Sequence, residues 1–128
     1  MQLSPRLVRW SPVLDGLVLV VFVAAGRENH DITGGALWAL KVIAPLAVGF
    51  AVMGLATRLY ASPARMWLRL AITIPGAVLI GGALRWIFRG MPAVSVFTVV
   101  ATGFFFVAMF GWRAIALAVT RRSARASA

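Results

Sequence analysis

The chain has 128 residues, of which 62% are hydrophobic and only 12% are charged. A soluble domain carries about a quarter of its residues as charges, so this chain lacks the polar surface needed in water and we expect it to lie in a bilayer. It contains no cysteine, which excludes disulfides and thiolate metal sites. The net charge of +10 would suggest nucleic acid in a soluble protein. Because most arginines flank apolar segments here, we expect them to contact anionic lipids and no nucleic acid.

The first predicted span covers residues 10–26 and has the least apolar length. Only Gly16–Gly26 is free of charge at its centre, which is about 17 Å of helix and too short to cross a bilayer. To span, this helix must begin near Trp10 and carry Asp15 into the membrane. The sequence therefore predicts a carboxylate at membrane depth.

A cleaved signal peptide is the alternative interpretation of this segment. Arg6 and Arg9 would be its basic start, residues 17–23 its apolar run, and Val23-Ala24-Ala25 its cleavage site. Asp15 at the head of the apolar run argues against this alternative, and so does the odd number of spans that cleavage would leave.

Three further spans follow along the chain. Residues 35–57 are interrupted only by Lys41, and residues 67–88 carry Arg69 and Arg85 close enough to their ends to snorkel. Residues 93–113 begin with twenty uncharged residues, about 30 Å of helix and one bilayer core. We expect 120–128 to be a flexible basic tail. The predicted fold is all-α: one domain over 1–128, a bundle of four transmembrane helices.

The basic residues predict the orientation of this bundle. With four spans, four of them fall on one side, and nine fall on the other: Arg6, Arg9, Arg58, Arg65, Arg69, Arg113, Arg121, Arg122 and Arg125. The side with nine should be cytoplasmic, so we expect both termini inside. Arginine stands at all basic positions but one, and this bias, together with the many alanines, is typical of a GC-rich bacterial genome. We therefore expect a multi-pass protein of the bacterial inner membrane.

Several short motifs occur in an order that resembles a known family. Asp15 precedes an apolar run into Gly26-Arg27-Glu28-Asn29-His30-Asp31, and Leu84–Gly90, Phe97–Ala101 and Gly111-Trp112-Arg113 follow. This order is similar to that of the prokaryotic membrane proteins called domain of unknown function 3054, and the resemblance covers nearly the whole chain. It implies four membrane helices and marks the aspartate, Arg27 and His30, but it implies no activity.

Asp15 is the first candidate for a functional residue. A carboxylate at membrane depth costs a few kcal/mol unless it is paired or protonated. Arg69 and Arg113 lie at the same predicted depth, so one hypothesis is a structural ion pair with either of them. The other hypothesis is a proton or cation site along a pathway.

A second candidate cluster combines Arg27, His30 and Asp31. Their spacing of i, i+3 and i+4 places them on one face if the first helix continues through them. Histidine titrates near neutral pH, which suits a proton relay, whereas the structural alternative is a solvated polar loop. The basic residues on the same predicted side, against which this cluster could close, are Lys41, Arg85 and Arg89.

The functional classes follow from these few residues. One histidine and no thiol fall short of a metal or haem site in a single chain, so we expect no cofactor. We favour a non-catalytic subunit or assembly factor of a larger membrane complex. The alternative is an oligomeric transporter or channel for ions or small solutes, which would use Asp15 and the Arg27/His30 cluster. A lipid enzyme would depend on His30 and Asp31 alone, and the residues do not identify an enzyme.

Overall fold

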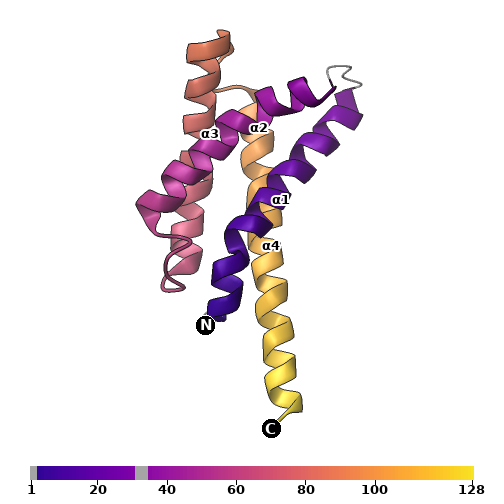
Figure 1. Ribbon diagram of the computed structural model, residues 1–128, viewed down its shortest axis with the longest axis vertical. Coiled ribbons are helices and arrows are strands. Elements are labelled where there is room, and N and C mark those ends of the chain that lie inside the picture. The colour runs from indigo at the N-terminus through magenta and orange to yellow at the C-terminus, as the bar shows by residue number, and fades with distance from the viewer. Residues whose placement is uncertain (1–2, 31–34) are drawn as a thin grey trace.

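The computed structural model describes residues 3–30 and 35–128 as four helices and their connections (Figure 1). The helices are α1 (Pro5–His30), α2 (Gly35–Thr57), α3 (Met66–Arg89) and α4 (Val96–Ala126). All four are long and apolar enough to cross a membrane. The predicted all-α fold with four membrane-spanning helices is therefore confirmed.

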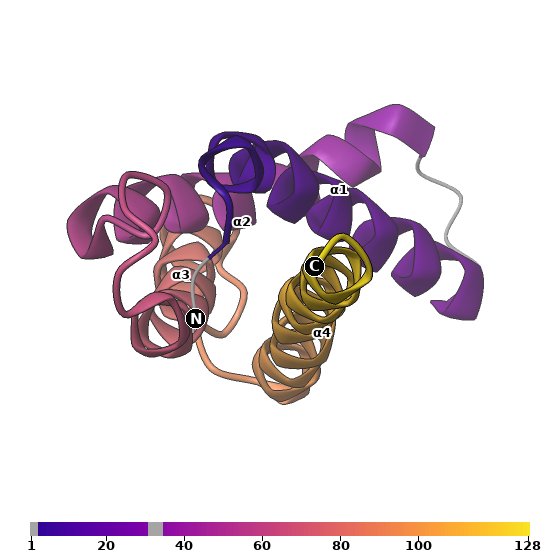
Figure 2. The ribbon, with the colours of Figure 1, turned by 90° about the horizontal axis from the view of Figure 1, so that it is seen from below.

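The helices contact one another in a ring, α1 with α2, α2 with α3, α3 with α4 and α4 with α1. Viewed along the bundle, α1 and α2 cross over one side of it while α3 and α4 complete the other (Figure 2). Both termini lie at the same end of the molecule (Figure 1). We call this the terminal end. The opposite end, where α1 ends, α2 begins and the α3–α4 connection lies, is called the distal end.

Local sequence signals explain most helix boundaries. Ser4 accepts a hydrogen bond from the backbone N–H of Leu7 (3.3 Å), and Pro5 occupies the first helical position, so α1 begins earlier than residue 10. Gly90 ends α3 in the left-handed conformation (φ 64°) and donates its N–H to the Trp86 carbonyl. Thr98 caps the start of α4 by accepting the Ser95 N–H (3.1 Å).

The other end of α4 differs from our expectation. This helix continues past residue 113 through Ala126, and residues 118–126 are exposed. Residues 120–126 therefore extend the helix beyond the terminal end of the bundle, where the sequence had suggested a flexible tail (Figure 1). Alanine and arginine in this segment are strong helix formers, which accounts for the extension.

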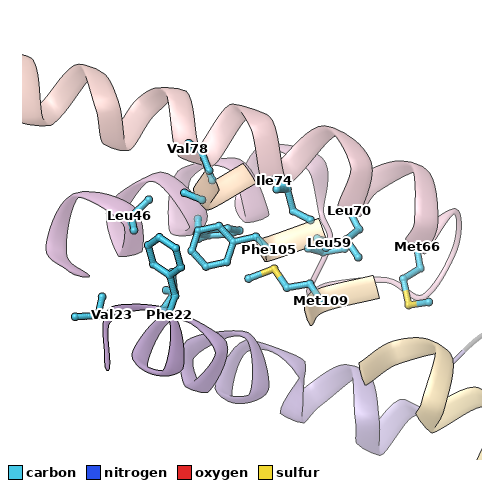
Figure 3. Close-up of a cluster of buried hydrophobic side chains, with 14 of the residues drawn as sticks. Phe22, Val23, Leu46, Leu59, Met66, Leu70, Ile74, Val78, Phe105 and Met109 are labelled. Carbon is cyan, nitrogen blue, oxygen red and sulfur yellow. The ribbon is translucent and has the colours of Figure 1, made fainter. Parts of the chain in front are cut away.

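The core is apolar and lies where all four helices meet (Figure 3). The ring of Phe105 on α4 is fully buried, 5.0 Å from Phe22 of α1 and 5.1 Å from Phe50 of α2 between centroids. Leu70 and Ile74 supply the contribution of α3 and are also fully buried.

The outer surface of the bundle is apolar as well. Large hydrophobic side chains there are mostly exposed, for example Leu55, Phe88 and Val107 at 81%, 79% and 78%. So much exposed apolar surface would aggregate in water, whereas it suits contact with lipid tails. Together with the four apolar helices, this surface defines a multi-pass membrane protein.

The closest helix approach is between α2 and α3. A Cβ atom at Gly49 would lie 2.2 Å from the backbone oxygen of Ala77, so only glycine fits at this crossing. A hydrogen bond joins the hydroxyls of Thr57 and Thr73 (2.8 Å) further along the same interface. Small residues and one polar contact thus hold these two helices together.

Candidate functional site

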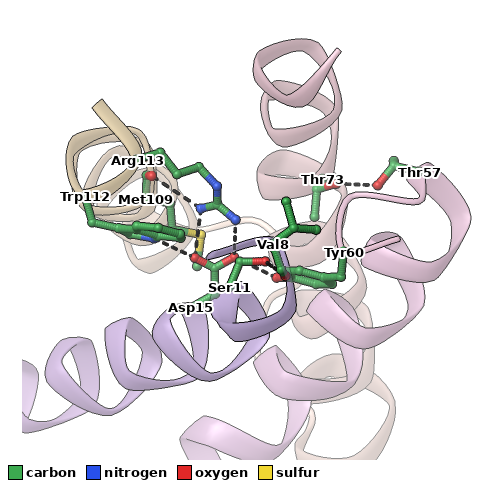
Figure 4. Close-up of polar contacts among 9 residues, drawn as sticks. All are labelled: Val8, Ser11, Asp15, Thr57, Tyr60, Thr73, Met109, Trp112 and Arg113. Atoms are coloured by element: carbon green, nitrogen blue, oxygen red, sulfur yellow. Dashed lines mark hydrogen bonds and ion pairs between the residues drawn. The ribbon is translucent and has the colours of Figure 1, made fainter. Parts of the chain in front are cut away.

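Asp15 is buried near the terminal end, with only 2% of its surface exposed. The structure pairs it with Arg113 of α4 in a two-pronged ion pair. Arg113 Nη1 donates to Oδ1 at 2.9 Å and Nη2 donates to Oδ2 at 2.7 Å, the forked geometry that arginine makes with carboxylates (Figure 4). Both charges are therefore removed from solvent together.

Two further donors complete the shell around the carboxylate. The indole N–H of Trp112 donates to Oδ1 at 2.9 Å, and the hydroxyl of Tyr60 donates to Oδ2 at 2.8 Å (Figure 4). An ionised carboxylate has about four acceptor positions, and four N–H or O–H groups now occupy them. We call Asp15, Tyr60, Trp112 and Arg113 the Asp15 cluster. It joins α1, the α2–α3 connection and α4.

Local sequence features place Tyr60 in this cluster. Arg58 adopts a left-handed conformation (φ 56°), so α2 ends at Thr57 and the chain turns back. The Tyr60 ring then lies against Gly54, where a Cβ atom would be 2.6 Å from the ring. Glycine at position 54 thus lets the ring cross α2 and reach Asp15.

Burial raises the pKa of the Tyr60 phenol well above its ordinary value, and the neighbouring Asp15 carboxylate raises it further by charge and by hydrogen bonding. Arg113 opposes this effect but does not cancel it. The phenol is therefore held protonated, as a donor to the carboxylate. A donor that does not ionise stabilises the negative charge of Asp15.

Arg69, the other arginine that we considered as a partner of Asp15, has a different contact. Its Nη1 donates to the backbone oxygen of Arg58 at 3.0 Å. It thus satisfies a carbonyl at the end of α2. The structure brings Arg113 to Asp15 and leaves Arg69 at the α2–α3 connection.

The residues of the second candidate cluster lie at the distal end. The backbones of Arg27 and His30 belong to α1, but their side chains and all of Asp31 lie outside the described residues, so the predicted contacts of this cluster remain predictions. Lys41 is exposed on α2. Among the described residues, no group of three His, Asp or Glu side chains is placed to hold a metal ion.

The structure brings Arg85 and Arg89 together at a cavity of about 570 Å³ at the distal end. All four helices and the α3–α4 connection line it. Its wall is mainly apolar and includes Phe22, Val23, Trp38, Val42, Phe97 and Val100. We call this space the distal cavity. Its volume falls in the range of ordinary ligand pockets.

Arg85 is buried in the wall of this cavity, 8% exposed. Its guanidinium lies 4.1 Å from the centre of the Phe97 ring, and Nη2 donates to the sulfur of Met91 at 3.5 Å. The Nε atom has no hydrogen-bond partner in the described part of the chain. Arg85 thus differs from Arg113, because a weak sulfur acceptor takes the place of a carboxylate.

Sequence reasoning did not find Tyr60 and Trp112. Both stand near span ends, where aromatic residues ordinarily face the lipid head groups. The sequence did contain a signal for the observed role. Trp112 directly precedes Arg113, and Tyr60 lies at the same predicted membrane depth as Asp15, so each could place a hydrogen-bond donor near the carboxylate.

The fold and the cluster together define a class of protein, a four-helix membrane bundle that buries a saturated ion pair near one end. The chain belongs to the family described as protein of unknown function (DUF3054), whose model matches residues 12–116. The resemblance inferred from the motifs is thereby confirmed. Neither a curated protein nor a solved structure matches the chain.

Proposed function

We propose that this protein is a non-catalytic subunit or accessory factor of a larger complex in a bacterial inner membrane. The observation that carries this proposal is the saturated Asp15 cluster. All four positions around its carboxylate serve to join helices, so the most expensive ionisable group in the membrane is used for structure. A bundle whose buried ion pair fixes its helices relative to one another presents a rigid surface, which is suited to binding partner proteins.

The C-terminal part of α4 supplies a surface for such a partner. It projects beyond the bundle as a helix (Figure 1). Arg121, Arg122 and Arg125 on this part of the helix are exposed. A row of positive charges on a rigid helix is complementary to an acidic protein surface. The same charges also suit anionic lipids, so the experiment has to separate the two.

Purification in mild detergent after photo-crosslinking tests the proposal. We expect a crosslinker at Ser123 to trap one stoichiometric protein partner, and a crosslinker at Val107, which is exposed at mid-helix, to trap lipid or nothing.

A charge-matched pair of triple variants provides the control. R121Q/R122Q/R125Q should lose the partner, whereas R6Q/R9Q/R65Q, which removes the same charge from other exposed positions, should retain it. A protein that purifies alone or only with copies of itself would overturn the proposal.

An oligomeric carrier or channel is the second candidate, and one observation favours it. Two arginines and a mainly apolar wall line the distal cavity, and pockets for small molecules commonly combine an apolar lining with a few polar groups. The saturated cluster argues against Asp15 as its mobile proton site, so this candidate would depend on the distal end. A lone homo-oligomer that carries a small anion into vesicles would establish it.

For a protein in the bacterial inner membrane we propose that both termini are cytoplasmic. With both termini cytoplasmic, a reporter active only in the periplasm should be silent when fused after Ala128 and active when inserted near Asn29. An active C-terminal fusion would reverse the proposed orientation.

A further inference from the structure

We infer that the distal cavity binds an anionic phospholipid, with the phosphate at Arg85 and Arg89 and an acyl chain along the apolar wall. This inference is independent of the proposed subunit function. It rests on the contacts of Arg85, the sign of the local charge and the composition of the wall.

The first step concerns the hydrogen-bond acceptors that the Arg85 guanidinium lacks. The guanidinium offers five N–H donors, of which one meets the Met91 sulfur, and Nε meets no acceptor among the described residues. The Nε atom is buried, so water does not replace its missing acceptor. A buried cation of this kind is costly until an oxygen-rich anion completes its shell.

The second step is the local charge. Arg85 and Arg89 stand four residues apart on α3 and both line the cavity, so two like charges converge there. This arrangement is unfavourable without an anion. Arginine matches phosphate with paired hydrogen bonds, and basic pockets between membrane helices suit lipid head groups.

The third step is the remainder of the cavity. Beside the arginines the wall consists of aromatic and aliphatic side chains from α1, α2 and α4, including Phe22, Val42 and Val100. A small inorganic anion would leave this surface empty. A lipid carries its phosphate and its acyl chain in one molecule, and the bilayer presents it at high concentration beside the helices.

The site is also held in shape by the backbone. A Cβ atom at Gly82 would lie 2.3 Å from the Ala93 oxygen, so the α3–α4 connection packs directly on α3. This contact holds Met91 near Arg85 and closes one side of the cavity. The arginine is therefore positioned before a ligand arrives.

Native mass spectrometry and thermal unfolding of the detergent-purified full chain test the inference. The probes are phosphatidylglycerol, phosphatidylcholine and inorganic phosphate. We expect the wild type to retain phosphatidylglycerol in preference to phosphatidylcholine and to be protected by it. R85Q should bind it about tenfold more weakly or worse, because a charge-assisted pair is lost.

Three further variants make the outcome specific. G26L should also weaken retention, because Gly26 lines the cavity and a Cβ there meets nothing within 4 Å. R9Q, which removes one exposed charge at the other end, should bind as the wild type does. R89Q changes an exposed residue at the cavity and serves as the second reporter if R85Q does not fold.

Stability without lipid distinguishes a ligand site from a structural role. R85Q should unfold at the same temperature as the lipid-free wild type or at a higher one, because it removes a buried cation with no described carboxylate partner. Equal retention of phosphatidylglycerol by R85Q and the wild type would overturn the inference. So would protection by inorganic phosphate equal to that by the lipid.

Discussion

Replacing Asp15 with asparagine removes one charge from the Asp15 cluster without changing its size. The amide oxygen can take the place of Oδ1 and keep the hydrogen bonds from Trp112 and from Nη1 of Arg113. The amide nitrogen then faces Nη2 of Arg113, so two donors oppose each other at the position of the present 2.7 Å contact. The opposite amide orientation is worse, because it places the amide nitrogen at the position of Oδ1. There it would face two donors, the Trp112 indole N–H and Nη1 of Arg113.

The expected cost follows from what remains buried. Arg113 is 1% exposed, so its charge stays in the interior without a counter-ion. Removing one partner of a buried pair costs about 3–5 kcal/mol. A domain of ordinary stability has about 5–15 kcal/mol in total, so D15N should be folded but severely weakened.

Unfolding of the purified protein in mixed micelles with increasing denaturing detergent measures this cost. R113Q should be destabilised as well, because it leaves the carboxylate with only Tyr60 and Trp112 as donors. The double variant D15N/R113Q should recover part of the loss, since no unmatched charge remains. The coupling free energy of this double-mutant cycle reports the pair itself.

A clear result would refute the structural interpretation. If D15N unfolds within about 0.5 kcal/mol of the wild type and the cycle shows no coupling, the pair does not hold the bundle together. If D15N also abolished a pH-dependent transport activity while folding normally, Asp15 would be a pathway residue. The two interpretations therefore predict different unfolding curves as well as different activities.

Three other expectations concern neutral contacts and one titration. T73V loses an uncharged interhelical hydrogen bond and should cost about 0.6 kcal/mol in the same unfolding assay, far less than D15N. G49A forces a Cβ against the Ala77 backbone and should cost about 1–3 kcal/mol, whereas G103A, where a Cβ meets nothing, should be neutral or stabilising. Tyr60 is the only tyrosine in the sequence, so phenolate absorbance reports this residue alone. In the folded protein the phenol should stay protonated at pH values above its unfolded pKa of about 10. Because the folded pKa of Tyr60 is raised, the free energy of unfolding should fall as the pH rises above about 10.

The sequence was sufficient for the architecture because the bilayer fixes helix length. Three segments of adequate apolar length, and a fourth that reaches this length once Asp15 is included, predict four helices. The gaps between the predicted spans at 58–66 and 89–92 correspond to the connections at 58–65 and 90–95. Bilayer thickness says nothing about how far a helix extends into water. For that reason α1 and α4 are longer than the spans predicted over residues 10–26 and 93–113.

For the candidate site, the sequence predicts the membrane depth of each residue but not the direction in which its side chain points. The short apolar run behind Asp15 predicts its burial, and depth alone limits its partners to Arg69 and Arg113. Choosing between these two requires the rotation of each helix about its axis, which depends on packing among all four. The same holds for Trp112: depth suggests an interfacial position, and only rotation turns its N–H toward the carboxylate.

The two buried arginines of the described residues show how context decides the role of one residue type. Arg113 and Arg85 each keep an Nε atom without a partner in the described part of the chain, and each lies over an aromatic ring. Arg113 has a carboxylate with two further donors around it, so its charge is neutralised within the protein. Arg85 has a sulfur atom and a second arginine beside a cavity, so an added anion would relieve both desolvation and repulsion. Among the described residues, the terminal end therefore pairs its buried arginine with a carboxylate, whereas the distal end holds two arginines whose charge the lipid that we propose would balance.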